Sequence, residues 1–255
     1  MPAIKNPFKA ALSDGKMQYG CWSGFADPFA IEVMGTAGFD WLVIDGEHAA
    51  NDIRSIMAQL QALQGSASHP VVRVPVGEDW LIKQVLDAGA QTVLVPMVES
   101  GAQAAQLVRA MRYPPEGIRG VGATMARASR FGGIADYVKV ANQEVCLLVQ
   151  VESRKGVAAL DDILAVDNID GVFIGPADLA ADMGHPGNAA HPEVRAMIRD
   201  LLGRIAASDK AAGILSPDDK VAAEYRDWGA QFLAVGLDVV MLAQAARAKA
   251  AHWKG

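Results

Sequence analysis

Three apolar segments of strand type run directly into acidic residues, a pattern that can deliver carboxylates to one site. They are Cys146 to Val151 ahead of Glu152, Gly171 to Ile174 ahead of Asp178, and Trp41 to Ile44 ahead of Asp45, Glu47 and His48. In an α/β barrel the C-terminal ends of the parallel strands converge on one mouth. Glu152 and Asp178, from neighbouring strands, would bind a hard divalent cation and leave coordination positions for water and substrate. The alternative is that both acids cap the following helices or pair with Arg154 and Lys155.

A charged side chain inside an apolar strand and a histidine beside carboxylates extend this candidate site. Arg73 stands in Val71-Val72-Arg73-Val74-Pro75, where burial without a partner is costly. It needs carboxylates, such as Asp45 or Glu47, or an anionic ligand whose charge it could stabilise. Histidine is the side chain that ordinarily changes charge near neutral pH, so His48 could move a proton if Asp45 orients its other nitrogen. No Gly-x-Ser-x-Gly elbow, Cys–His pair or lysine inside a strand indicates covalent catalysis.

Short β-branched runs alternate with amphipathic helical stretches along the chain, which predicts parallel strands joined by helices. Eight strands are expected, at Tyr19–Gly24, Trp41–Asp45, Val71–Pro75, Thr92–Pro96, Val145–Val151, Gly171–Ile174, Gly213–Ser216 and Phe232–Gly236. Helices are expected at Asn6–Ser13, Asp52–Leu63, Glu78–Ala88, Ala102–Met111, Pro192–Ala207, Pro217–Trp228 and Asp238–Lys249. Asn51 or Asp52, and Ser216, are expected as N-caps.

Eight β/α units without a break in composition predict an α/β fold, a single (β/α)8 TIM barrel domain spanning residues 1–255. The short N-terminal helix would close the bottom of the barrel. A Rossmann fold is the weaker alternative, because no glycine-rich dinucleotide fingerprint follows the first strand.

The overall composition favours a cytoplasmic enzyme without nucleic-acid or membrane partners. Hydrophobic residues make up 51% of the 255 residues, charged residues make up 20%, and the net charge is −6. A large core is therefore possible, whereas nucleic-acid binding normally needs a basic surface. No segment has the pattern of a signal peptide or the length of a membrane span. Cys21 and Cys146 are too few for a disulfide framework and are expected as small apolar residues.

The connection after the fourth barrel helix breaks the regular alternation. Residues 113–133 are rich in glycine and contain Arg119, Arg127 and Arg130. A connection of this length in a compact domain is typical of a substrate-contacting loop or a subunit contact. Both interpretations stay open on the sequence.

Several motifs together resemble one enzyme family. They are Phe39-Asp40-Trp41 through Asp45-Gly46-Glu47-His48, Val93-Leu94-Val95-Pro96-Met97-Val98, Arg112-Tyr113-Pro114-Pro115 to Gly120, and Gly175-Pro176-Ala177-Asp178-Leu179. Together these motifs resemble the class II, metal-dependent pyruvate aldolases of the 4-hydroxy-2-oxoheptanedioate aldolase family. The likeness covers nearly the whole chain. Relatives of that family include aldolases for 2-keto-3-deoxy sugar acids. The resemblance implies a (β/α)8 barrel, a divalent cofactor (Mg²⁺, Mn²⁺ or Co²⁺) and a homo-hexamer with an exchanged C-terminal helix.

The resemblance also implies a role for each candidate residue. Glu152 and Asp178 would bind the metal, which a 2-oxo acid would chelate through its carboxylate and keto oxygens. Arg73 would stabilise the enolate formed on carbon–carbon cleavage, and His48, oriented by Asp45, would serve the aldehyde oxygen. The rest of the pocket would comprise Gln150, Gly175, Pro176, Ala177, Trp22, Ser23, Leu215 and, from a neighbouring subunit, Asp87.

The leading hypothesis is a lyase that reversibly cleaves a 4-hydroxy-2-oxo acid into pyruvate or hydroxypyruvate and an aldehyde. A dication and a guanidinium supply the electron sink for this cleavage, and His48 suits the role of base for the C4 hydroxyl. One alternative is a citrate-lyase β-type enzyme acting on an acyl-CoA thioester, although an acidic chain offers little basic surface for CoA phosphates. A phosphoenolpyruvate-handling transferase and a non-catalytic oligomeric barrel are the others. The sequence names neither the natural aldehyde nor the preferred metal.

Overall fold

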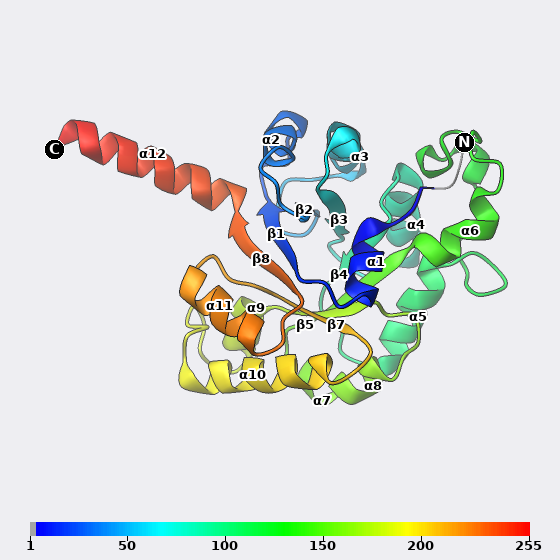
Figure 1. Cartoon of the computed structure of the whole chain (residues 1–255). Helices are drawn as coiled ribbons and strands as arrows, with labels where there is room; N and C mark the ends of the chain where they lie inside the picture. The colour runs from blue at the N-terminus through cyan, green and yellow to red at the C-terminus, as the bar shows by residue number, and fades with distance from the viewer. Residues whose placement is uncertain (1–3) are drawn as a thin grey trace.

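Eight parallel strands close into a barrel surrounded by helices (Figure 1). The computed structural model describes residues 4–255. The strands are β1 Gln18–Ser23, β2 Trp41–Asp45, β3 His69–Arg73, β4 Thr92–Val95, β5 Cys146–Val151, β6 Gly171–Ile174, β7 Ala211–Leu215 and β8 Phe232–Leu237. Each strand pairs with its neighbours in sequence, and β8 pairs with β1. The predicted (β/α)8 barrel is confirmed, with each strand within two residues of its expected bounds.

Most of the helices form an outer ring around the strands, whereas α1 covers one end of the barrel and α12 leaves it. The helices are α1 Pro7–Ser13, α2 Pro28–Met34, α3 Ile53–Ala62, α4 Asp79–Ala88, α5 Gly101–Met111, α6 Tyr137–Glu144, α7 Arg154–Ala158, α8 Leu160–Leu164, α9 Pro176–Asp182, α10 Pro192–Ala206, α11 Asp219–Asp227 and α12 Asp238–Lys254. Asp52 caps α3, as one of the two expected residues. The expected cap at Ser216 is wrong: Asp218 accepts the first N–H groups of α11, so that helix begins two residues later than predicted.

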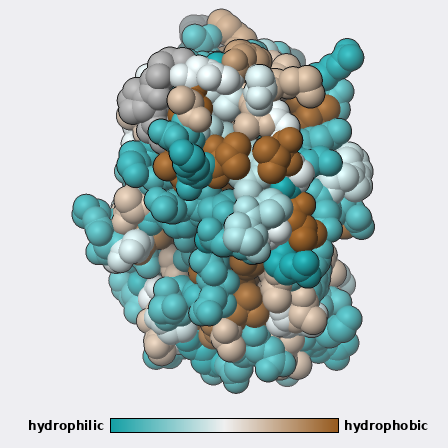
Figure 2. Space-filling model, turned by 90° about the vertical axis from the view of Figure 1, so that its right-hand side faces the viewer, coloured by the Kyte–Doolittle hydropathy of each residue, from teal (hydrophilic) through white to brown (hydrophobic). Residues whose placement is uncertain are grey.

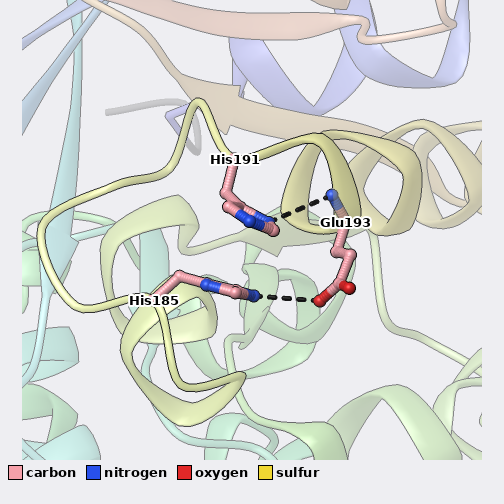
Figure 3. A group of neighbouring side chains, drawn as sticks. All are labelled: His185, His191 and Glu193. Atoms are coloured by element: carbon pink, nitrogen blue, oxygen red, sulfur yellow. Dashed lines mark hydrogen bonds and ion pairs between the residues drawn. The ribbon is translucent and has the colours of Figure 1, made fainter.

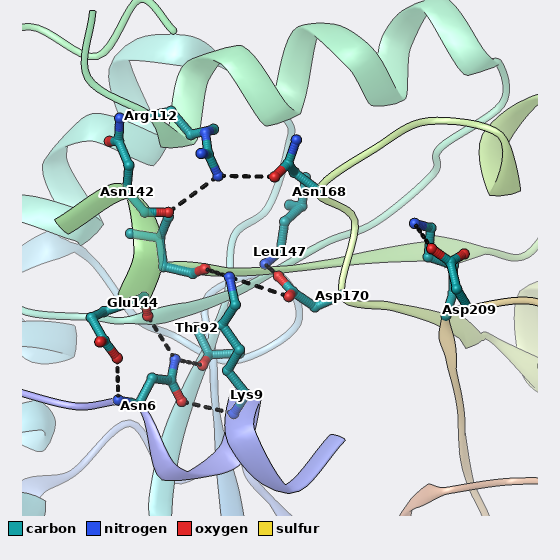
Figure 4. A network of polar contacts seen from close by, with 12 residues as sticks. Asn6, Lys9, Thr92, Arg112, Asn142, Glu144, Leu147, Asn168, Asp170 and Asp209 are labelled. Carbon is teal, nitrogen blue, oxygen red and sulfur yellow. Dashed lines mark hydrogen bonds and ion pairs between the residues drawn. The ribbon is translucent and has the colours of Figure 1, made fainter. Parts of the chain in front are cut away.

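The short helix α1 covers the N-terminal end of the barrel, as predicted. Phe8 is buried among the aromatic residues of the barrel interior. Asn6 Nδ2 donates to Thr92 Oγ1 at 3.0 Å and to the backbone oxygen of Glu144 at 3.0 Å (Figure 4). Lys9 Nζ donates to the backbone oxygen of Val145 at 2.7 Å. This network closes the bottom, so substrate access is through the opposite, C-terminal mouth.

The last helix is exceptional because it leaves the barrel. Figure 1 shows α12 projecting away from the strands. Met241, Leu242 and Trp253 on this helix are 47%, 59% and 75% exposed. Apolar side chains on a projecting helix favour burial against another surface. Within residues 4–255, no helix is long and apolar enough to cross a membrane.

Candidate active site

The expected site residues follow the C-terminal ends of four strands. Asp45 and Arg73 end β2 and β3 and lie opposite each other in register. Glu152 directly follows β5, and Asp178 lies in the first turn of α9 after β6. The barrel therefore brings to one mouth residues that are far apart in the sequence.

Glu152 is the buried centre of this group, only 3% exposed. Its Oε1 accepts the backbone N–H of Met97 at 2.9 Å, and its Oε2 accepts the amide of Gln150. Met97, which donates this N–H, adopts a φ of 54°, unusual for a residue other than glycine. Burial raises the pKa of Glu152, and the negative charges of Asp178 and Glu47 act in the same direction. A cation beside these acids would remove that penalty.

Gly175 has no side chain, and this leaves room for the Glu152 carboxylate. A Cβ atom at this position would lie 2.3 Å from Glu152 Oε2 and 3.1 Å from Gln150 Nε2. The glycine at the end of β6 is thus required by the close approach of a side chain from β5.

Arg73 is held by two carboxylates and an aromatic face. Its Nε and Nη2 donate to Asp45 at 2.9 and 2.6 Å, and its Nη1 lies 2.8 Å from Glu47 Oε2. The guanidinium carbon is 4.9 Å from the centroid of the Trp22 ring. Burial would raise the pKa of Asp45, but the hydrogen bonds and charge of Arg73 outweigh it and hold that pKa below its ordinary value. The ion pairs that the sequence left open are therefore present, and they fix the guanidinium at the mouth.

His48 stands at the rim, with 67% of its side chain exposed. The expected orientation of its ring by Asp45 is wrong. Asp45 accepts the backbone N–H groups of Glu47 and His48 at 2.9 and 3.3 Å, and Trp22 Nε1 lies 3.3 Å from its other oxygen. Because Arg73 also donates to Asp45, both Asp45 oxygens already accept hydrogen bonds from groups other than the His48 ring. The carboxylate nearest the imidazole is Glu47, whose Oε1 lies 3.9 Å from His48 Nε2.

The donors gathered here fit a hard divalent cation. Glu152, Asp178 and Glu47 supply carboxylate oxygens; the charges of Asp178 and Glu47 act on Glu152, and that of Asp178 acts on Glu47. Among the residues that the structure describes, Gln150 Oε1 and Ser23 Oγ are buried without a hydrogen-bond partner. All of these donors are oxygens, the preference of Mg²⁺ and Mn²⁺. The residues present are thus suited to such an ion and to a polar ligand beside it.

Comparison with known proteins decides the family. A sequence model described as HpcH/HpaI aldolase/citrate lyase matches residues 18–245. The chain belongs to this family. It is 65% identical to a hydroxypyruvate/pyruvate aldolase of Roseovarius nubinhibens, covering 100% of this chain and 99% of the relative. It is 50% identical to a 4-hydroxy-2-oxo-heptane-1,7-dioate aldolase of Escherichia coli, covering 98% and 95%. A solved HpcH/HpaI aldolase/citrate lyase family protein from Burkholderia cenocepacia superposes with a TM-score of 0.95 at 40% identity, covering 98% of this chain and 100% of that one. The predicted family and the prediction of an aldehyde-lyase enzyme are confirmed.

The remaining positions expected of an HpcH/HpaI aldolase divide into two groups. Trp22 and Ser23 end β1, and Leu215 ends β7, so they lie at the mouth with Pro176 and Ala177 of α9. Asp87 lies elsewhere, on the outer helix α4, where its Oδ1 accepts Arg119 Nη2 at 2.6 Å. No described contact joins Asp87 to the mouth of its own barrel, so any role in catalysis would be at another subunit.

The arginine-rich connection is tied to the outer helices rather than to the mouth. The Arg119 side chain is fully buried and lies 4.4 Å from the centroid of the Tyr113 ring. Arg127 donates to the backbone oxygens of Ala88 and Leu60 at 2.9 and 3.3 Å. Two of its three arginines therefore bind within the chain and away from the mouth, and neither interpretation of the segment is decided by these contacts.

Sequence reasoning missed two features of the aldolase site. The sequence presents Met97 only as part of a motif, because no local signal shows that its backbone N–H bonds to a residue 55 positions away. It indicates Glu47 as a partner of Arg73, but not as a third acid beside Glu152 and Asp178. The available signal for Glu47 is its position two residues after Asp45, since both carboxylates bind the guanidinium of Arg73.

Proposed function

We propose that this chain is a metal-dependent aldolase that reversibly cleaves 4-hydroxy-2-oxo acids into pyruvate or hydroxypyruvate and an aldehyde. The observation that carries the proposal is the buried Glu152 carboxylate beside Asp178 and Glu47, without a cationic side chain bonded to it among residues 4–255. The names of the 65% and 50% identical relatives favour these substrates. The citrate lyase β subunit of M. tuberculosis, at 18% identity and a TM-score of 0.58, shares the fold alone.

The chain's own residues have separable tasks in this reaction. When bound by Glu152 and Asp178, a Mg²⁺, Mn²⁺ or Co²⁺ ion supplies a Lewis acid for the 2-oxo acid. Arg73, fixed by Asp45, offers its charge to the keto oxygen as the carbon–carbon bond breaks. Gln150 orients the donor through its free Oε1 or its amide, and the backbone of Gly175, Pro176 and Ala177 borders the donor carboxylate.

His48 is placed for the aldehyde end of the substrate. Its exposed ring at the rim can accept the proton of the C4 hydroxyl during cleavage and return it during synthesis. Glu47, 3.9 Å away, is the carboxylate that would stabilise the charged ring. Trp22, Ser23 and Leu215 border the space between donor and acceptor.

The test is an aldol assay on chelator-stripped protein. Pyruvate or hydroxypyruvate is supplied with a panel of aldehydes, with and without Mg²⁺, Mn²⁺ or Co²⁺. Metal-restored carbon–carbon bond formation is expected, and the panel ranks donors and acceptors. If no metal gives a product and the protein turns over an acyl-CoA thioester, the site carries out the citrate-lyase type of reaction instead.

We also propose that the chain assembles as a homo-hexamer in the cytoplasm. The projecting α12 and the exposed Val121, Met125 and Phe131 (63%, 84% and 70%) offer apolar surface for other subunits. The side that carries α5 and α6 shows apolar patches among polar residues (Figure 2). Free buried cysteines, Cys21 and Cys146, suit a reducing compartment.

Assembly is tested by sedimentation. The full chain should sediment at about six times its 26.9 kDa mass, and a chain ending at Leu237 should form smaller species. A full chain that stays monomeric at micromolar concentration would refute the proposal, and with it a role for Asp87 at a neighbouring mouth.

A further inference from the structure

Two histidines and a glutamate outside the mouth form a second cluster of metal-binding groups (Figure 3). His185 lies in the turn after α9, His191 is the N-cap of α10, and Glu193 lies in the first turn of α10. One ligand atom from each residue lies within 4.8 Å of the other two. None of these residues takes part in the site formed by Glu152 and Asp178.

The contacts within the cluster leave a place for a cation. His185 Nε2 and Glu193 Oε2 are 2.9 Å apart and joined by one hydrogen bond. His191 Nδ1 accepts the backbone N–H of Glu193 at 3.3 Å, which leaves Nε2 as its free ligand atom. A cation in place of the proton of that hydrogen bond could therefore be reached by two imidazole nitrogens and one carboxylate oxygen, once the rings adjust, without breaking the helix cap.

The backbone that carries these side chains is held in place by its own hydrogen bonds. His185 N donates to Ala180 O at 2.8 Å, Asn188 N to His185 O at 3.0 Å, and His191 N to Asn188 O at 3.1 Å. Gly184, at a φ of 88°, allows the sharp turn out of α9. Binding would thus order few additional groups, which keeps its entropic cost low.

The two rings need one adjustment to share an ion. They stack with centroids 3.5 Å apart and planes inclined by 15°, so their in-plane lone pairs run side by side. Glu193 has 69% of its side chain exposed and His185 has 24% exposed, so both can move. Rotation of the His185 ring, which leaves the His191 cap in place, would turn its nitrogen toward the His191 Nε2, as a four-coordinate site requires.

We propose that His185, His191 and Glu193 bind Zn²⁺, with water as the fourth ligand. Two imidazoles and one carboxylate suit this borderline cation, whereas the all-oxygen site at the mouth suits Mg²⁺ or Mn²⁺. The ion fastens the turn after α9 to the start of α10. Because α9 also carries Asp178 in its first turn, the ion stabilises the segment that follows the mouth.

The test is Zn²⁺ binding by equilibrium dialysis, with excess Mg²⁺ present. All proteins in this test also carry Asp178→Asn, which removes a metal ligand at the mouth, so that Zn²⁺ bound there does not contribute to the measured binding. One tightly bound Zn²⁺ per chain is expected. His185→Gln and Glu193→Gln should each weaken Zn²⁺ affinity by about 10- to 100-fold. His252→Gln, on the projecting helix, is the matched control and should leave the affinity unchanged. Equal affinity in His185→Gln and in the matched control would overturn the proposal.

A second measurement keeps the proposal open to refutation if His185→Gln fails to fold. The wild-type chain, saturated with Mg²⁺, is titrated with Co²⁺ as a spectroscopic substitute for Zn²⁺. Visible absorption of a four-coordinate site that Zn²⁺ then displaces is expected. Absence of such a band overturns the proposal, and neither result depends on aldolase turnover.

Discussion

Replacing Gly175 by alanine should disable the metal site while leaving most of the protein folded. The added Cβ would lie 2.3 Å from Glu152 Oε2 and 2.8 Å from Glu152 Cβ, where ordinary contact begins at 3.4 Å. The carboxylate must therefore move by about 1 Å, while its Oε1 is held by the Met97 N–H. A displacement of this size at a reacting centre costs about 100-fold in rate. Overpacking of this kind costs about 1–3 kcal/mol of unfolding free energy.

The assay is steady-state cleavage of a 4-hydroxy-2-oxo acid at saturating Mn²⁺, together with Mn²⁺ affinity and thermal unfolding. Gly203→Ala is the matched control, because Gly203 lies within α10 with no atom within 4 Å of the added Cβ. The control should keep full activity and gain up to about 1 kcal/mol from helix propensity. If Gly175→Ala retains the kcat/KM and Mn²⁺ affinity of the wild type, the packing of Glu152 against β6 is not what shapes the site.

Three further changes test other parts of the account. Arg73→Ala leaves Asp45 and Glu47 buried without their cation, so we expect about 3–5 kcal/mol of destabilisation in urea and loss of turnover; near-wild-type stability would refute the described ion pairs. His48→Ala should slow aldol cleavage more than solvent exchange of the pyruvate methyl protons, and equal losses would argue against a role at the aldehyde. Burial lowers the pKa of His69 to about 4, below its unfolded value, so the folded state binds fewer protons and loses stability as pH falls from about 6.5 toward 4. Between pH 7 and 4.5 this loss amounts to about 2–3 kcal/mol; His69→Gln should flatten that part of the profile, and an unchanged slope would contradict the assignment.

The barrel and the strand-end residues could be predicted because both follow from local patterns. Strands buried on both faces read as continuous apolar runs, so the acids after β5 and β6 stood out. Arg73 was conspicuous for the same reason, and its expected carboxylate partners are present.

The features that were missed depend on tertiary contacts. Asp45 cannot orient the His48 ring because Trp22 and Arg73 occupy its oxygens, and only the closed barrel brings those groups together. The short helices α2, α6, α7, α8 and α9 are absent from the sequence prediction, since packing against neighbouring elements rather than length supports helices of this size. The sequence pattern of α12 predicts a helix but contains nothing that fixes its direction away from the barrel.

The most direct test of the central claim is a Mn²⁺ titration followed by electron paramagnetic resonance, with pyruvate present. Wild-type protein should bind one Mn²⁺ per chain at the mouth, and Glu152→Gln and Asp178→Asn should each lose that ion while keeping the circular dichroism of the barrel. Unchanged Mn²⁺ binding in both folded variants would contradict the claim that these two carboxylates hold the metal.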